Sequence, residues 1–163
     1  MPHDGLIEAA SAALTALAGA SSDARALFVP GRLEVLGKHT DYAGGRSLLA
    51  AAELGICFAI RPRSDAQVRV VDATSKETVD FTIGPALRRA PGHWGNYPMA
   101  VARRIARNFP GPLKGADIAF ASDLPPAAGM SSSSALVVGF FTVLADVNQL
   151  EHRHEYIENV HSR

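Results

Sequence analysis

The stretch from residue 131 to residue 144 constrains the fold of this 163-residue chain more than any other. Four consecutive serines lead into an apolar run that ends at Leu144. A helix that is apolar on every side has to be buried against other elements. The segment Ala116–Ala121 precedes it with the weak alternation of a strand, and a loop of Pro, Ala and Gly at Leu124–Gly129 joins the two. The pattern therefore predicts a strand, a loop of small residues and a buried helix that packs on a sheet.

Further helices and strands are expected around this unit. Leucines at helical spacing in an alanine-rich stretch predict a helix over Glu8–Ala20, and apolar residues four apart predict a second over Trp94–Phe109. Segments rich in β-forming residues predict strands at Ala26–Leu36 with a kink at Pro30 and Gly31, Leu54–Arg61, Gln67–Asp72 and Thr78–Ile83. We expect the last three strands to be antiparallel, a polar loop over Gly37–Arg46, and a last short helix from about Glu151. This mixture, without repeats or linkers, predicts one α+β domain.

Composition excludes several classes of protein. Lys and Arg number 16, as do Asp and Glu, so the chain has no basic surplus for a nucleic-acid backbone. A single cysteine, Cys57, excludes an internal disulfide framework, and we expect it to be a small buried apolar residue. No apolar run is long enough to span a membrane, and the N-terminus lacks the basic region of a secretory signal. We therefore expect a cytoplasmic protein without nucleic-acid or membrane partners.

The loop before the serine-rich helix has the chemistry of a phosphate site. Small side chains leave peptide N–H groups uncovered, and the first turn of a helix adds unpaired N–H groups and a positive dipole end. Serine hydroxyls can also reach a phosphate-bound Mg²⁺. The alternative is that Ser131 or Ser132 only caps the helix and the other residues fill a tight turn. No lysine follows Gly129, so this is not a Walker-type loop.

Three motifs in a fixed order narrow the interpretation. Pro30 to Gly45 reads PGRLEVLGKHTDYAGG, His93 to Tyr97 reads HWGNY, and Asp123 to Ala135 reads DLPPAAGMSSSSA. The first resembles the galactokinase signature, a PGR followed by a GEHTDY-type loop and a glycine pair. The second is similar to the W-x-N-Y that opens a helix in the same enzymes, and the third resembles their LPxGxGLSSSA phosphate loop. From about residue 25 to residue 163 the chain resembles the galactokinase branch of the GHMP kinase superfamily.

This resemblance implies a two-domain α+β kinase. The N-terminal domain of the family resembles domain 2 of ribosomal protein S5, and its C-terminal domain is ferredoxin-like; only the first is expected in residues 1–163. Within it we expect the sugar-binding signature at about 28–50 and the phosphate loop with its helix at about 123–146. The catalytic aspartate of the family would lie beyond Arg163, so we expect a truncated chain whose partner is the remainder of the kinase.

The activity implied by the resemblance is ATP-dependent phosphorylation of a sugar, with ATP and Mg²⁺ as cofactors and the anomeric hydroxyl as the acceptor. Arg32 matches the arginine that stabilises charge on the transferring phosphoryl group. The residues expected on the sugar side are Glu34, Lys38, His39, Asp41 and Tyr42. Those expected on the nucleotide side are Trp94, Pro125, Ala127, Ala128, Gly129, Met130, Ser131, Ser132 and Ser133. Ser133 and Glu158 match the residues associated with Mg²⁺.

Each role has a structural alternative. Arg32 could form a surface salt bridge, His39 a hydrogen bond within its loop, and Glu158 could simply be solvated. Trp94, a candidate wall of the adenine pocket, could instead pack at the start of its helix. His152 and His154, two residues apart, are expected at the surface and not on a metal.

The chain also departs from the family pattern. Lys38 stands where the family has glutamate, which suggests an acidic sugar such as galacturonate as an alternative substrate. Glu34 stands where the family has asparagine, and we expect it to form an ion pair with Arg32. Ala127 and Ala128 replace glycines of the phosphate loop. Two non-catalytic alternatives remain: a sugar- or ATP-sensing protein on the same scaffold, and a purely structural domain.

Overall fold

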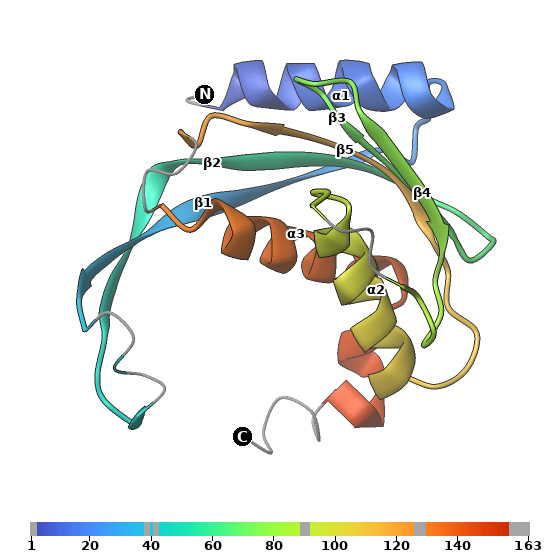
Figure 1. The fold of residues 1–163 in the computed structure, drawn as a ribbon. Coiled ribbons are helices and arrows are strands. Elements are labelled where there is room, and N and C mark those ends of the chain that lie inside the picture. The colour runs from blue at the N-terminus through green and yellow to red at the C-terminus, as the bar shows by residue number, and fades with distance from the viewer. Residues whose placement is uncertain (1–2, 38–39, 41–42, 89–91, 126–129, 157–163) are drawn as a thin grey trace.

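A mixed β-sheet with helices on both faces organises the chain (Figure 1). The computed structural model describes residues 3–37, 40, 43–88, 92–125 and 130–156. Its elements, in chain order, are α1 (Asp4–Ala18), β1 (Arg25–Leu36), β2 (Leu48–Pro62), β3 (Gln67–Asp72), β4 (Thr78–Thr82), α2 (Asn96–Asn108), β5 (Ala116–Ser122), α3 (Ser132–Val147) and the 3-10 turn η2 (Leu150–His152). The expected α+β class is confirmed.

The order of the strands in the sheet is β1-β2-β5-β3-β4. The directions of β2, β3 and β4 alternate, as expected, but β2 and β3 are not neighbours, because β5 lies between them and runs parallel to β3. Only β3 and β4 pair as expected. All residues of β5 except Ser122 are buried, so this strand belongs in the middle of the sheet. Turn residues indicate only which strands follow one another in the chain, so they cannot predict that β5 is inserted between β2 and β3.

Strand β2 divides the interior into two cores. Ile56, Phe58 and Ile60 belong to the larger core, together with side chains of α2 and α3, whereas Cys57 and Ala59 pack with α1. This alternation follows from the opposite directions of successive side chains in a strand. Helix α3 lies very close to the sheet at Gly139, where an added Cβ would be 2.2 Å from Phe58 Cε2. The expected burial of Cys57 is confirmed, and burial raises the pKa of its thiol.

The helices agree with the sequence patterns and differ at their ends. Helix α1 begins earlier than expected, with Asp4 in its first turn, and it stops before Gly19, whose φ is +80°. Helix α2 buries Val101 and Ile105, as their spacing predicts. Near Glu151 the chain forms η2 and then a further helical turn from residue 154. Within the described residues, no helix is both long enough and apolar enough to cross a membrane.

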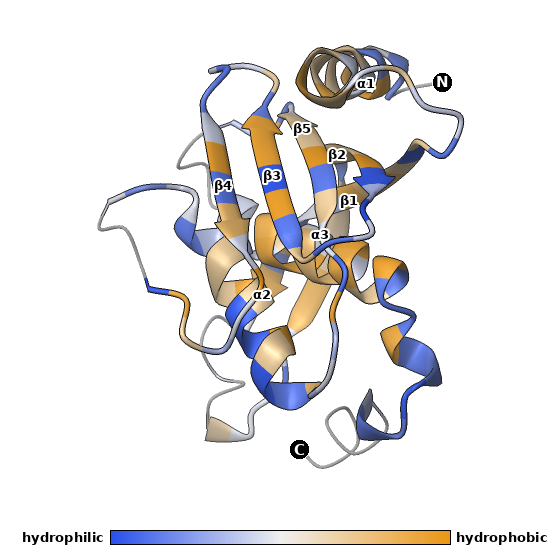
Figure 2. Cartoon of the chain, turned by 90° about the vertical axis from the view of Figure 1, so that its right-hand side faces the viewer, coloured by the Kyte–Doolittle hydropathy of each residue, from blue (hydrophilic) through white to orange (hydrophobic). Residues whose placement is uncertain are grey.

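A buried carboxylate lies on the face of the sheet that α1 covers. Asp117, on the same face of β5 as Ala119 and Ala121, is fully buried. It accepts hydrogen bonds from Arg61 Nη2 at 2.7 Å, from Arg69 Nε at 2.6 Å and from Arg63 Nη1 at 3.2 Å. Figure 2 shows that hydrophilic bands interrupt the mainly hydrophobic strand β3, the strand that contributes Arg69 to this cluster.

This cluster also fixes the end of α1. Arg61 Nη1 donates to the carbonyl of Ala18, the last residue of that helix. Burial alone would raise the pKa of Asp117, but hydrogen bonds from Arg69 and Arg61 outweigh it and hold the pKa below its usual range. The carboxylate therefore stays ionised and ties three strands and a helix end together.

Candidate functional site

The candidate site begins on an arm formed by β1 and β2. We call residues 32–36 and 48–51 the β1–β2 arm; it extends away from the other strands and curves to one side of the molecule (Figure 1). The register shifts between Pro30 and Arg32 and again between Glu34 and Leu36. The first shift coincides with the kink that the sequence predicts at Pro30 and Gly31. The arm carries Arg32 and Glu34, and it leads into the loop that holds the rest of the first motif.

A backbone hydrogen bond brings this arm to the serine-rich helix. The N–H of Arg32 donates to the carbonyl of Met130 at 3.1 Å, although 98 positions separate the two in sequence. Gly31 permits this approach, because an added Cβ would lie 2.6 Å from Leu124 Cδ2 and 3.3 Å from the Met130 carbonyl oxygen. The first and third motifs are therefore adjacent in space.

Reciprocal hydrogen bonds anchor the start of the third motif. The N–H of Gly55 donates to Asp123 Oδ1 at 2.7 Å, and the N–H of Asp123 donates to the Gly55 carbonyl at 3.2 Å. The N–H of Leu124 donates to Ser122 Oγ at 3.2 Å. Thus both ends of the segment between β5 and α3 are held against β1 and β2.

The serine-rich end of α3 lies at the surface. Ser131 occupies the N-cap position with left-handed backbone angles, φ 55° and ψ 41°, and its side chain makes no cap hydrogen bond. Ser132, Ser133 and Ser134 follow in the first turn and are exposed. A helix start without a side-chain cap presents unpaired N–H groups and a positive dipole end. The capping alternative therefore does not account for Ser131.

Arg32 forms the expected ion pair. Its Nη2 lies 3.6 Å from Glu34 Oε2, with 47% of the Arg32 side chain and 20% of the Glu34 side chain exposed. The Arg32 side chain is thus paired on the arm while about half of it faces solvent. An arginine in this position can still contact an anionic ligand.

Trp94 packs against the sheet at the start of α2. Its Nε1 donates to Glu77 Oε2 at 2.8 Å, and its ring meets the ring of Phe120 edge to face at 5.3 Å between centroids. These contacts are those of the packing alternative. A wall of an adenine site stays a prediction for Trp94.

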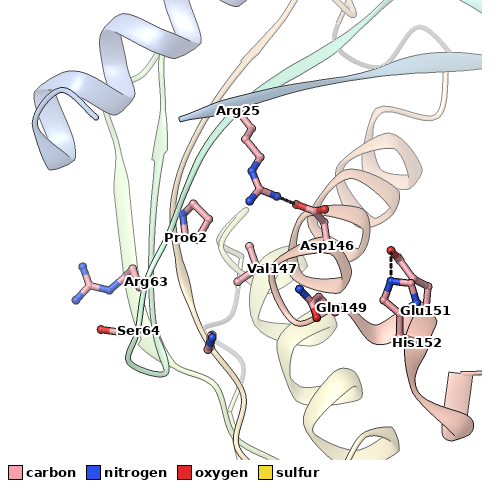
Figure 3. Close-up of a pocket in the computed structure, with 10 residues that line it drawn as sticks. Arg25, Pro62, Arg63, Ser64, Asp146, Val147, Gln149, Glu151 and His152 are labelled. Atoms are coloured by element: carbon pink, nitrogen blue, oxygen red, sulfur yellow. Dashed lines mark hydrogen bonds and ion pairs between the residues drawn. The ribbon is translucent and has the colours of Figure 1, made fainter. Parts of the chain in front are cut away.

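A hollow in the structure lies far from this region. It has a volume of about 460 Å³ and lies beside Arg25, Asp146 and Gln149, at the C-terminal end of α3 (Figure 3). In its wall, the side chains of Arg25 and Asp146 point toward one another and form an ion pair, with 2.6 Å between Arg25 Nη1 and Asp146 Oδ2. The 16 residues of α3 make the helix about 24 Å long, so this hollow is a helix length away from the serine-rich end.

The described residues at the serine-rich end include one of the two expected Mg²⁺ ligands, Ser133, whereas Glu158 lies outside the described residues. Mg²⁺ is commonly bound by one or two protein oxygens together with substrate phosphates, and a serine hydroxyl with one carboxylate suits that pattern. Ser133 supplies the hydroxyl. In the part of the chain that the structure describes, no three His, Cys, Asp or Glu side chains gather as a metal cluster. Several expected site residues lie outside the described residues: Lys38, His39, Asp41, Tyr42, Ala127, Ala128, Gly129 and Glu158.

Sequence reasoning missed two features of this region. The exchange of hydrogen bonds between Gly55 and Asp123 had no signal beyond an acidic residue at a strand end. The arginine cluster around Asp117 did have a signal in the sequence: a charged residue stands inside the apolar segment GADIAFAS. Neither signal names its partners, because those lie more than 45 positions away in the sequence.

Two family models match the chain. Residues 15–62 match the galactokinase galactose-binding signature, and residues 96–162 match the GHMP kinases N terminal domain. The two matches include the β1–β2 arm and the serine-rich helix.

Relatives and solved structures agree with these matches. The chain is 36% identical over 112 residues to a galactokinase of Glaesserella parasuis, covering 69% of this chain and 29% of the relative. It is 38% identical over 125 residues to a galactokinase of Chloroflexus aggregans, covering 74% of this chain and 32% of the relative. The crystal structure of Lactococcus lactis galactokinase complexed with galactose superposes with a TM-score of 0.79 at 24% identity, over 91% of this chain and 39% of that one.

The chain thus spans about 30% of the length of the curated relatives it matches. The architecture is that of the N-terminal domain of GHMP kinases, as the motifs imply. The chain belongs to the galactokinase branch of the GHMP kinase superfamily and corresponds to the N-terminal part of its members.

Proposed function

We propose that this chain provides the sugar-binding and phosphate-binding part of an ATP-dependent sugar kinase. The kinase transfers the γ-phosphoryl group of MgATP to a sugar hydroxyl, the anomeric one in our proposal. The observation that carries the proposal is the hydrogen bond from the Arg32 N–H to the Met130 carbonyl, 3.1 Å long. It places an arginine of the sugar signature beside the helix start that suits a phosphate.

The proposed roles follow the two sides of this contact. Residues 28–50 bind the sugar: the Asp41 carboxylate accepts hydrogen bonds from its hydroxyls, and the His39 ring forms a further hydrogen bond with a hydroxyl. Within residues 123–146, the loop and the first turn of α3 bind the phosphates through their uncovered N–H groups. Arg32 lies between the two sides and stabilises negative charge on the phosphoryl group in transfer.

Ser133 and Glu158 would hold Mg²⁺ in this proposal. The ion neutralises charge on the nucleotide phosphates when it is bound. Ser133 is exposed in the first turn of α3, the end of the helix that binds the phosphates in this proposal. Trp94 is proposed to border the adenine while its indole N–H remains bonded to Glu77.

An acidic sugar is a second candidate substrate, favoured by Lys38. An ammonium group has three donors and a positive charge, and it suits a carboxylate better than a neutral hydroxyl. The two candidates differ in one measurable respect: a galactose kinase works on galactose and rejects galacturonate, whereas the alternative enzyme does the reverse.

The test combines binding with turnover. Thermal unfolding of the 163-residue chain is followed with MgADP, with galactose and with galacturonate, each alone and with MgADP present. The natural protein, isolated with any polypeptide that accompanies it, is assayed for phosphoryl transfer from MgATP to each sugar. A thermal shift with MgADP and one sugar, together with transfer to that sugar, supports the proposal. Binding without transfer supports the sensing alternative, and no shift under any condition supports a purely structural domain.

A further inference from the structure

A carboxylate lies against the arginine at the centre of the candidate site. Glu34 follows Arg32 by two positions on β1, and the 3.6 Å between its Oε2 and the Arg32 Nη2 is longer than a hydrogen bond. The contact is therefore an ion pair that leaves the guanidinium N–H donors available to another acceptor. Glu34 is the more buried partner, with 20% of its side chain exposed against 47% for Arg32.

The backbone of Arg32 is fixed independently of this ion pair. Its N–H is bonded to the Met130 carbonyl, and the preceding Gly31 fits tightly against Leu124 and Met130. Loss of the Glu34 charge would leave this backbone contact in place. It would change the charge and the freedom of the Arg32 side chain.

A carboxylate at this distance lowers the positive potential that an incoming anion meets at Arg32. Because the pair is partly exposed, water and salt screen the interaction, so Glu34 weakens the charge of Arg32 without cancelling it. An anion that binds Arg32 has to compete with a partner already in place.

We propose that Glu34 is a positioning residue that holds the Arg32 guanidinium on the arm and limits its affinity for the phosphate groups of the nucleotide. The inference rests on the proposed function, in which Arg32 contacts those phosphates. Glu34 then acts through Arg32 and does not bind the sugar. Both substrate and product phosphates are released more readily than they would be from an unpaired arginine.

The test uses inorganic tripolyphosphate as the probe and calorimetric titration of the 163-residue chain at low ionic strength. Four chains are compared: the natural sequence, Glu34→Gln, Arg32→Gln and the double variant. A fifth, Asp146→Asn, is the control, since it removes a carboxylate from another arginine ion pair, that with Arg25, at the opposite end of α3. Circular dichroism and thermal unfolding are used to check that all five chains are folded.

We expect Glu34→Gln to bind tripolyphosphate about two- to fivefold more tightly, which is the range of an exposed ion pair. The gain disappears at high salt and in the Arg32→Gln background, and Asp146→Asn leaves the affinity unchanged. Weaker binding by Glu34→Gln, or an equal gain without Arg32, overturns the inference and leaves the proposed function standing. Unchanged affinity in Arg32→Gln, or no binding by any variant, overturns the proposed role of Arg32 and the inference with it.

Discussion

The backbone N–H of Arg32 lies 3.1 Å from the carbonyl oxygen of Met130, and this contact joins the kinked first strand to the entry of the serine-rich helix. Neither residue uses its side chain for it. The geometry of the candidate site therefore depends on how closely two backbones approach, and Gly31 is the residue that permits the approach.

Gly31→Ala is expected to separate the two backbones. The new Cβ would lie 2.6 Å from Leu124 Cδ2 and 3.3 Å from two carbonyl oxygens, so the Leu124 side chain and the strand have to shift. We expect the free energy of unfolding to fall by about 1 to 3 kcal/mol and the binding of MgADP to weaken. Chemical denaturation and calorimetry measure the two effects. Gly5→Ala, where nothing lies within 4 Å, is the control: it should leave MgADP binding unchanged and should not lower the stability, because alanine is favoured over glycine in helix α1.

Asp117→Asn should be among the most destabilising single changes. It leaves three arginines around a fully buried site without their counter-charge, so we expect a loss of about 3 to 5 kcal/mol in the free energy of unfolding. Urea denaturation measures it. Asp65→Asn, which removes a more exposed partner of Arg63, should cost much less; equal losses would contradict a special role for the buried carboxylate.

The same carboxylate makes the fold sensitive to acid. Burial alone would raise the pKa of Asp117, yet its arginine partners hold that pKa below its usual range in the folded chain. A lowered pKa stabilises the folded state above the unfolded value, and the stabilisation is lost as the pH falls through the folded value. The stability of the natural chain should therefore fall more steeply below about pH 4 than that of Asp117→Asn. Parallel curves for the two chains, measured by denaturation at each pH, would exclude this contribution.

Trp94 offers a direct optical test, because it is the single tryptophan of the chain. We expect ADP to change its fluorescence and tripolyphosphate to leave it nearly unchanged, since only ADP carries a base that could lie beside the indole. A second chain, Trp94→Phe, should lose about 1 to 3 kcal/mol of stability, because it lacks the N–H donor to Glu77 and part of the packing on Phe120. An identical fluorescence response to both ligands would leave Trp94 with its packing role alone.

A comparison of Ser133 with its neighbour Ser134 distinguishes a metal ligand from a surface hydroxyl. Both are exposed in the first turn of α3. Ser133→Ala should weaken ADP binding in the presence of Mg²⁺ by about 1 to 2 kcal/mol and have little effect without the ion. Ser134→Ala should behave like the natural chain in both conditions. Calorimetric titration with and without Mg²⁺ decides, and equal effects of the two substitutions would argue against a selective role for Ser133.

Local sequence patterns anticipated most of the elements. The four-residue spacing of Val101 and Ile105 placed α2, and the apolar run to Leu144 placed α3, because each pattern arises from burial of a helix surface. The three motifs identified the family, and they divided the candidate residues into a sugar-side group and a nucleotide-side group. Helix ends moved by a few residues, as at Asp4, where only local hydrogen bonding decides the boundary.

The sequence by itself determined the α+β class, the elements and the family, since these depend on periodicity, turn residues and short motifs that are read within a few positions. Only the tertiary structure decided that β5 inserts between β2 and β3, that Asp117 collects three arginines, and that Arg32 meets Met130. Each of these joins residues that are distant in the chain. Their energies come from burying surfaces and charges together, and a local pattern contains no record of which distant partner completes the burial.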